Sequence, residues 1–272
     1  MPRKPSRCGP PVLDSGVSVV TDPVQRRALW IELAIVGVMT FGSSALLAIL
    51  ALVEAQLTGG IDQTTVALNP SRSDIAWIDA ARQAISVVRL AGMAVLAGYL
   101  LWRSGIRLTV VGLTRRPARG DVPYGLGLAA LIGLPGLGLV VLAHAVGMNA
   151  ALVPGDTDGP WWQIPMLIAI AIGNAVAEEV VVVAYLLVRL RQLGLRDASA
   201  LASSALLRGS YHLYQGIGGG LGNVVMGLVF GRFYQRTGRL WPLVIAHAVI
   251  DVVAFVGFLL IGDRLGISEL RK

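Results

Sequence analysis

Long apolar stretches separated by short polar ones dominate this chain. Four stretches contain no Asp, Glu, Lys or Arg: residues 33–53, 90–102, 122–155 and 159–177. About 18 consecutive apolar residues suffice for a helix to cross the hydrocarbon core of a membrane, which is about 30 Å thick. The pattern therefore predicts an all-α, polytopic integral membrane protein.

We expect about seven hydrophobic segments, with six and eight as the bounds. They cover roughly residues 29–53, 84–102, 124–146, 161–190, 198–213, 221–234 and 240–261. The fifth and sixth segments are short for crossing a membrane. They either span it or form a re-entrant pair inside the bundle, and the sequence leaves both interpretations open.

The same pattern divides the chain into four parts. Residues 1–28 form a basic, proline-rich tail that we expect to be disordered, and residues 29–150 hold the N-terminal transmembrane helices. Residues 151–262 form a helical core, and residues 263–272 form a polar C-terminal tail. The first 28 residues lack the apolar region of a cleavable signal peptide, so we expect the first segment to remain as an anchor.

Composition excludes an ordinary soluble domain. Hydrophobic residues make up 55% of the chain and charged residues only 14%, against about 25% charged residues in soluble domains. The net charge is +7, from 23 Lys and Arg against 16 Asp and Glu. A basic protein can bind nucleic acid, but here the charge falls in short clusters between hydrophobic segments. We therefore expect the lipid bilayer, and no nucleic acid, as a partner.

The basic clusters also predict an orientation. They follow the second and fourth segments and precede the seventh: Arg103, Arg107, Arg115, Arg116 and Arg119; Arg189, Arg191 and Arg196; Arg232, Arg236 and Arg239. Seven alternating segments place all of these clusters, and the basic N-terminal tail, on one side. Because cytoplasmic loops carry an excess of Lys and Arg, we expect a cytoplasmic N-terminus. Short Arg-flanked loops suggest a bacterial cell membrane.

Ionisable residues within the hydrophobic segments concentrate in the last hundred residues or so. They are, in chain order, Glu178, Glu179, Arg208, His212, His247 and Asp251. Such residues are costly in a membrane and usually face the protein interior. One of them alone could simply hydrogen-bond a neighbouring helix, but so many on three late segments indicate a functional site.

Helical spacing sorts these residues into faces. Asn174, Glu178 and Tyr185 lie at i, i+4 and i+11 and should form one polar stripe. Glu179 is rotated by about 100° from Glu178, so we expect the two adjacent carboxylates to have different partners. His247 and Asp251, like Arg208 and His212, are four residues apart and share a face.

At these residues the chain resembles the CPBP family, the CAAX-protease and bacteriocin-processing (Abi) intramembrane proteases. That family carries Glu-Glu-x-x-x-Arg, Phe-x-x-x-His and His-x-x-x-Asn/Asp on successive late helices. The corresponding stretches here are 178–183 (Glu-Glu-Val-Val-Val-Val), 208–212 (Arg-Gly-Ser-Tyr-His) and 247–251 (His-Ala-Val-Ile-Asp). The resemblance covers about residues 161–257 and makes the part 151–262 a CPBP-like catalytic core.

Two positions depart from the family pattern. The Arg that follows the Glu pair in the family is Val183 here, and the family Phe is Arg208. We hypothesise that Arg208 supplies the missing positive partner of Glu179 across a helix interface. An unpaired buried carboxylate would otherwise carry a large desolvation cost.

The resemblance implies a CAAX-prenyl-protease-like endopeptidase that hydrolyses a membrane-associated peptide or protein by an activated water. It implies the catalytic residues Glu178, Glu179, His212, His247 and Asp251, supported by Arg208 and Asn174. Glu178 would act as general base with His212, while His247 and Asp251 would stabilise the oxyanion. No cofactor is required by this scheme.

Two further interpretations remain open at the level of the sequence. The family is commonly labelled metalloprotease, and Glu178, His212 and His247 would supply three zinc ligands with an open position for water. The residues would also suit a non-enzyme: a scaffold or immunity-type membrane protein of the same fold, or a proton-coupled transporter.

Overall fold

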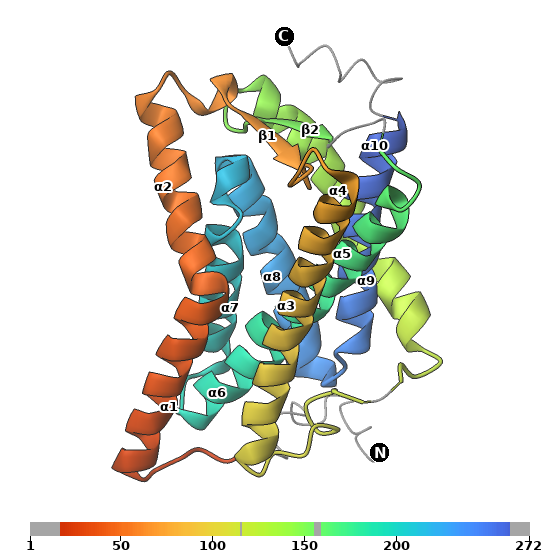
Figure 1. Ribbon diagram of the computed structural model, residues 1–272. Coiled ribbons are helices and arrows are strands. Elements are labelled where there is room, and N and C mark those ends of the chain that lie inside the picture. Colours follow the sequence, from red (N-terminus) through yellow and green to blue (C-terminus); the bar gives the residue numbers. More distant parts are fainter. Residues whose placement is uncertain (1–16, 115, 155–158, 262–272) are drawn as a thin grey trace, which may run out of the picture.

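The computed structural model describes residues 17–114, 116–154 and 159–261 as a bundle of long helices (Figure 1). The first half comprises α1 (Pro23–Gly37), a π-helical turn (Val38–Gly42), α2 (Ser43–Leu57), α3 (Ala76–Arg103) and α4 (Asp121–Ala145). The second half comprises α5 (Gln163–Glu178), a π-helical segment (Glu179–Tyr185), α6 (Leu186–Gln192), α7 (Asp197–Ser210), α8 (Ile217–Thr237), α9 (Trp241–Val252), a π-helical turn (Val253–Gly257) and α10 (Phe258–Ile261).

Each predicted hydrophobic segment coincides with a helix or a run of helices, so the predicted helical membrane bundle is confirmed. Within the described residues, four runs are long and apolar enough to cross a membrane: Pro23–Leu57, Ala76–Arg103, Asp121–Ala145 and Gln163–Gln192. The apolar run Trp241–Gly257 is shorter. The apolar outer faces of α2, α3 and α4 are exposed, which suits contact with lipid.

Helices α7 and α8 form an antiparallel pair that extends as far as the end of α4. The turn between them bonds to the chain just beyond α4, through Ile217 N to Met148 O (2.9 Å) and Ala150 N to Gln215 O (3.0 Å). Gly216 makes this approach possible, because its φ is +115° and a Cβ there would lie 2.5 Å from the Met148 oxygen. The short fifth and sixth segments therefore run through the bundle.

The basic clusters gather at one end of the bundle, as predicted. Figure 1 shows α1 starting, and α3, α6 and α8 finishing, at the same lower end. We call this the basic end. A two-stranded parallel sheet lies near the opposite end, where β1 (Thr65–Leu68) pairs with β2 (Ala151–Pro154). This sheet ties together the two loops at that end and is a small addition to an otherwise helical fold.

The boundary between tail and first helix differs from the expected one. Helix α1 begins at Pro23 rather than near residue 29, because Asp22 caps it by accepting a hydrogen bond from Gln25 N at 2.8 Å and proline suits the first helical position. Residues 1–16 and 262–272, which make up most of the two expected tails, lie outside the described residues.

Arg189 belongs to the interior and not to the surface cluster in which the sequence placed it. Its side chain is fully buried and forms an ion pair with Glu32 of α1 at 2.8 Å. The other two guanidinium nitrogens donate to Ser104 and Gln192 and to the Leu100 carbonyl, all at 2.7–2.8 Å. This network joins α1, α3 and α6 and satisfies each nitrogen of the arginine.

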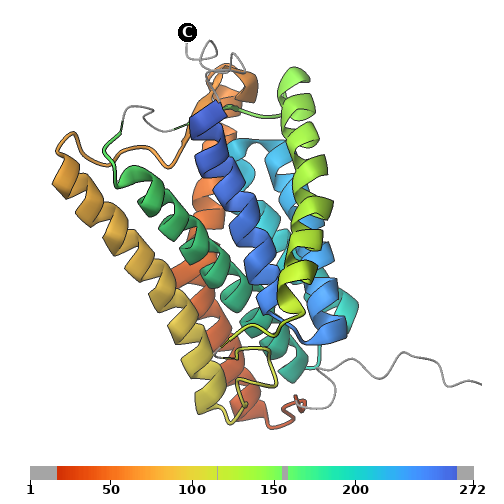
Figure 2. The same cartoon turned by 90° about the vertical axis from the view of Figure 1, so that its right-hand side faces the viewer.

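The C-terminal helices pack tightly around the π-helical segment. Figure 2 shows α9 between α4 and α5, and α9 contacts both of these helices. The valines at 180–183 are almost completely buried. Small residues permit the close approach of α7 and α8, as membrane helices commonly require: a Cβ on Gly209 would lie 2.8 Å from the Gly220 carbonyl oxygen.

We expect Gly209→Ala to destabilise the protein by about 1–3 kcal/mol, because the added methyl group overpacks the α7–α8 interface. Gly127→Ala is the matched control, since nothing lies within 4 Å of its Cβ position on α4. That variant should be neutral or gain up to about 1 kcal/mol of helix propensity. Thermal unfolding in detergent measures both, and equal stabilities would contradict the packing.

Candidate active site

The two adjacent glutamates mark the transition from α5 to the π-helical segment. Glu178 is the last residue of α5 and Glu179 the first of the wider π-helical turn. Both side chains are buried, and they take different hydrogen-bond partners: Tyr211 for Glu178, and Arg208 and His247 for Glu179. The prediction that the two carboxylates face apart is thus confirmed.

Glu178 is bound by a tyrosine that the sequence analysis missed. The Tyr211 hydroxyl donates to Glu178 Oε2 at 2.6 Å, and its ring packs on Phe41 and on His212 with centroid separations of 4.9 and 4.7 Å. The signal was present in the sequence, because Tyr211 directly precedes His212 in a motif. A buried tyrosine hydroxyl generally requires a hydrogen-bond partner.

Glu179 lies in a buried charge cluster of three helices. Arg208 Nη2 on α7 donates to Glu179 Oε1 at 2.6 Å, with both side chains fully buried, and His247 Nδ1 on α9 contacts the same oxygen at 2.8 Å. The hypothesised ion pair between Arg208 and Glu179 across the helix interface is therefore present. Arg208 also lies 5.7 Å from the centroid of the Phe230 ring on α8.

The two histidines are held in different ways. His247 directs Nδ1 at Glu179 and Nε2 toward Asp251 Oδ1, which is 3.6 Å away and beyond ordinary hydrogen-bond length. His212 directs Nδ1 at the Arg208 carbonyl oxygen at 2.9 Å. Because a carbonyl only accepts, Nδ1 must carry the proton, which leaves Nε2 of neutral His212 as an acceptor.

All of the predicted site residues converge between α5, α7 and α9. Glu178 interacts electrostatically with His247, His212 and Arg208, and Asn174 approaches the Asp251 carboxylate from α5. The expected stripe fails only at Tyr185, whose hydroxyl donates to Glu32 at 2.8 Å. The π-helical segment lies between Glu178 and Tyr185 and breaks the 100° spacing on which the stripe was predicted.

The candidate site lies in a segment of the chain that matches a known protein family. Residues 160–253 match the Rce1-like family, described as type II CAAX prenyl endopeptidase Rce1-like. That segment includes every residue of the candidate site. Over these residues the chain is similar to the Rce1-like family, in accord with the CPBP resemblance of its motifs. At the level of the family, the match and the apolar helices together indicate an integral membrane protein of the CAAX-protease type. No curated protein matches the chain, and no solved structure does.

The described side chains do not form the zinc site that the sequence allowed. Among the described residues, no group of three or more His, Cys, Asp or Glu side chains is placed to hold a metal ion. Nδ1 of His247 is bonded to Glu179 Oε1 at 2.8 Å, so that nitrogen is not available to a metal. As arranged, the three predicted ligands do not fit a metal.

The ion pair between Glu179 and Arg208 predicts how the helical core responds to substitution. Arg208→Phe restores the family residue but leaves Glu179 without its arginine, and should cost about 3–5 kcal/mol of stability. Adding Val183→Arg restores the family arginine four residues after Glu179 and should recover much of that loss. Melting temperatures of the wild type, the single and the double variant in detergent measure both effects. A double variant no more stable than Arg208→Phe would refute the exchange of partners.

Proposed function

We propose that this protein is an intramembrane endopeptidase that hydrolyses a peptide bond of a membrane-associated protein or peptide. The observation that carries the proposal is the position of Glu178, a buried carboxylate beside two histidines in a segment of the Rce1-like family. The proposal also places the basic end in the cytoplasm, in accord with the positive-inside rule, and the protein in a bacterial cell membrane.

Glu178 is suited to activate water. Tyr211 occupies its Oε2 atom, and no hydrogen bond within the described part of the chain engages Oε1. A water between Oε1 and the Nε2 acceptor of His212 would be held by two groups that accept its protons. Glu178 takes one proton as the water oxygen attacks the peptide carbonyl carbon, which generates a tetrahedral oxyanion.

His247 is suited to stabilise that oxyanion. Its Nε2 atom is 3.6 Å from Asp251, so this N–H is not committed to a short hydrogen bond. The carboxylates of Glu179 and Asp251, on either side of the ring, favour the doubly protonated imidazole. Such a ring can donate from Nε2 to the oxyanion without losing its bond to Glu179.

The second half of the reaction returns the proton. Glu178, now protonated, donates it to the amide nitrogen as the carbon–nitrogen bond breaks. The second proton of the water leaves the new carboxyl group for the amine, so the products are a carboxylate on one fragment and a protonated amine on the other, and the enzyme recovers its initial charge. Arg208 takes no part in these transfers: it neutralises Glu179, which in turn orients His247.

We expect Glu178→Gln and His212→Ala each to abolish cleavage of membrane-anchored peptides by the purified protein, as followed by mass spectrometry. His144→Gln is the matched control, since His144 bonds to the Asn149 carbonyl and is absent from the site contacts. It should cleave like the wild type.

Two outcomes of this assay would redirect the assignment. Folded wild type and variants that are equally inert would favour a scaffold or a transporter of this fold. Cleavage lost on treatment with a chelator and restored by zinc would contradict water activation by these side chains alone. We expect activity to survive the chelator.

Tyr211→Phe tests the role of the tyrosine. Loss of a hydrogen bond to a charged group is worth about 1.5–3 kcal/mol, so kcat should fall about 10- to 100-fold. KM should change little, because Tyr211 positions Glu178 and is not expected to bind substrate. A proportional rise in KM at constant kcat would show instead that the tyrosine contributes to substrate binding.

A further inference from the structure

An apolar groove of about 530 Å³ opens near the basic end between α4, α7 and α8. Its apolar lining comprises Leu128, Leu201, Leu228, Val229 and Phe233. None of the candidate active-site residues lines it. The groove is therefore separate from the catalytic machinery proposed above.

Two arginines stand at the groove on the last turns of α8. Arg232 and Arg236 are four residues apart, so they lie on one face of the helix, and both are exposed. Arg232 has a long contact with Gln235 (3.4 Å), and no ion pair with a carboxylate is found for either arginine among the described residues. The apolar groove thus has a doubly positive rim.

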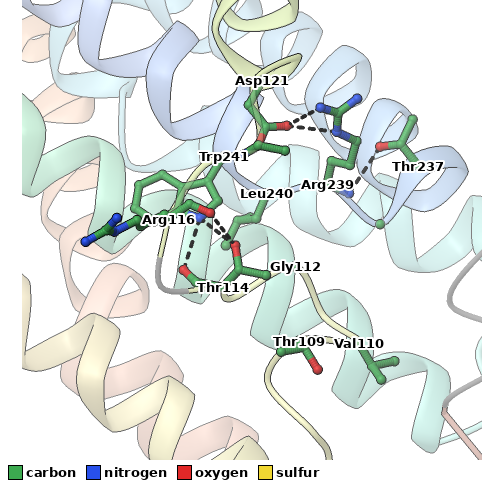
Figure 3. Close-up of a pocket in the computed structure, with 12 residues that line it drawn as sticks. Thr109, Val110, Gly112, Thr114, Arg116, Asp121, Thr237, Arg239, Leu240 and Trp241 are labelled. Carbon is green, nitrogen blue, oxygen red and sulfur yellow. Dashed lines mark hydrogen bonds and ion pairs between the residues drawn. The ribbon is translucent and has the colours of Figure 1, made fainter.

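A second, polar pocket adjoins this rim. It has a volume of about 470 Å³, and Thr237 lines both cavities. Figure 3 shows its frame: Arg239 bonds to Asp121, and the Trp241 indole donates to Thr114 at 3.0 Å. Arg116 also lines it and is exposed. A polar group held at the groove rim would therefore find polar and basic surroundings.

We propose that the groove binds an anionic phospholipid, with one acyl chain against Leu228 and Phe233 and the phosphate between Arg232 and Arg236. The helices that form the groove belong to a membrane bundle, so lipid is the molecule that meets them. Charge complementarity selects an anionic headgroup, as for other basic sites between transmembrane helices. The polar pocket beyond Thr237 accommodates the remainder of the headgroup.

A lipid suits this groove better than a peptide. An extended peptide exposes N–H and C=O groups that need partners, and leaving them unpaired in an apolar environment is costly. The groove offers apolar side chains along its length and hydrogen-bond donors only at one end. That distribution is complementary to a molecule with an apolar chain and a single charged terminus.

The test is lipid-dependent stability of the full-length protein in detergent. Phosphatidylglycerol should raise the melting temperature by about 4 °C near saturation, whereas phosphatidylcholine should raise it much less. Arg232→Gln with Arg236→Gln should abolish the difference between the two lipids. The matched control is Arg103→Gln with Arg107→Gln, an exposed pair of arginines that lines neither cavity, and it should retain the difference.

Two further experiments distinguish the contribution of the lipid's acyl chain from that of its headgroup. Leu228→Trp, which fills part of the groove, should weaken the effect of phosphatidylglycerol while leaving both arginines in place. Glycerol 3-phosphate, which has the anionic group without acyl chains, should give no comparable shift. Equal shifts with both lipids, equal losses in the two arginine double variants, or a full shift with glycerol 3-phosphate would each overturn the proposal.

Discussion

The structure depends on the neutralisation of one buried carboxylate. Glu179 is completely inaccessible at the centre of the bundle, where an unpaired charge would carry a prohibitive desolvation cost. Arg208 and His247 both bond to its Oε1 atom. Because these three residues belong to three different segments, satisfying the carboxylate fixes how the π-helical segment, α7 and α9 pack together. The same contacts orient the imidazole of His247 toward Asp251.

Neutralising Glu179 leaves Glu178 free for a different use. The two residues are adjacent in sequence, but Glu179 bonds to Arg208 and His247, whereas Glu178 accepts from Tyr211. Two carboxylates pointing into one pocket would repel each other and share protons. Their separation onto different faces allows Glu179 to anchor the fold while Glu178 remains available for the proton transfer proposed above.

Much of this arrangement could be predicted from the sequence, and the failures have identifiable causes. Apolar runs located the helices, and spacing four residues apart grouped His247 with Asp251. Relative to the family motif, the chain lacks an arginine at position 183 and has an additional one at position 208. That difference predicted the ion pair between Arg208 and Glu179, which the structure contains. The predicted polar stripe was wrong at Tyr185, because a π-helical segment changes the rotation per residue. No local sequence pattern indicated that segment.

Contacts between residues far apart in the sequence were the other feature that could not be predicted. Glu32 and Arg189 are 157 residues apart and form an ion pair, yet each alone looks like an ordinary charge at the end of a segment. Tyr211 was missed for a related reason, since its role depends on a glutamate of another helix. Helical periodicity describes which residues share a face, but it does not say which faces meet.

The two buried arginines show the difference between a scaffold and a site. Arg189 donates from all three of its nitrogens, and such saturated networks rigidify a fold. In the cluster around Arg208, by contrast, Arg208 Nε and Nη1 and Glu179 Oε2 are buried and find no hydrogen-bond partner among the described residues. Unsatisfied buried polar groups are rare in proteins, and a catalytic role is one reason for which they persist. The incompletely satisfied cluster lies beside Glu178 and His247, which is where a reaction that creates and removes charge would need it.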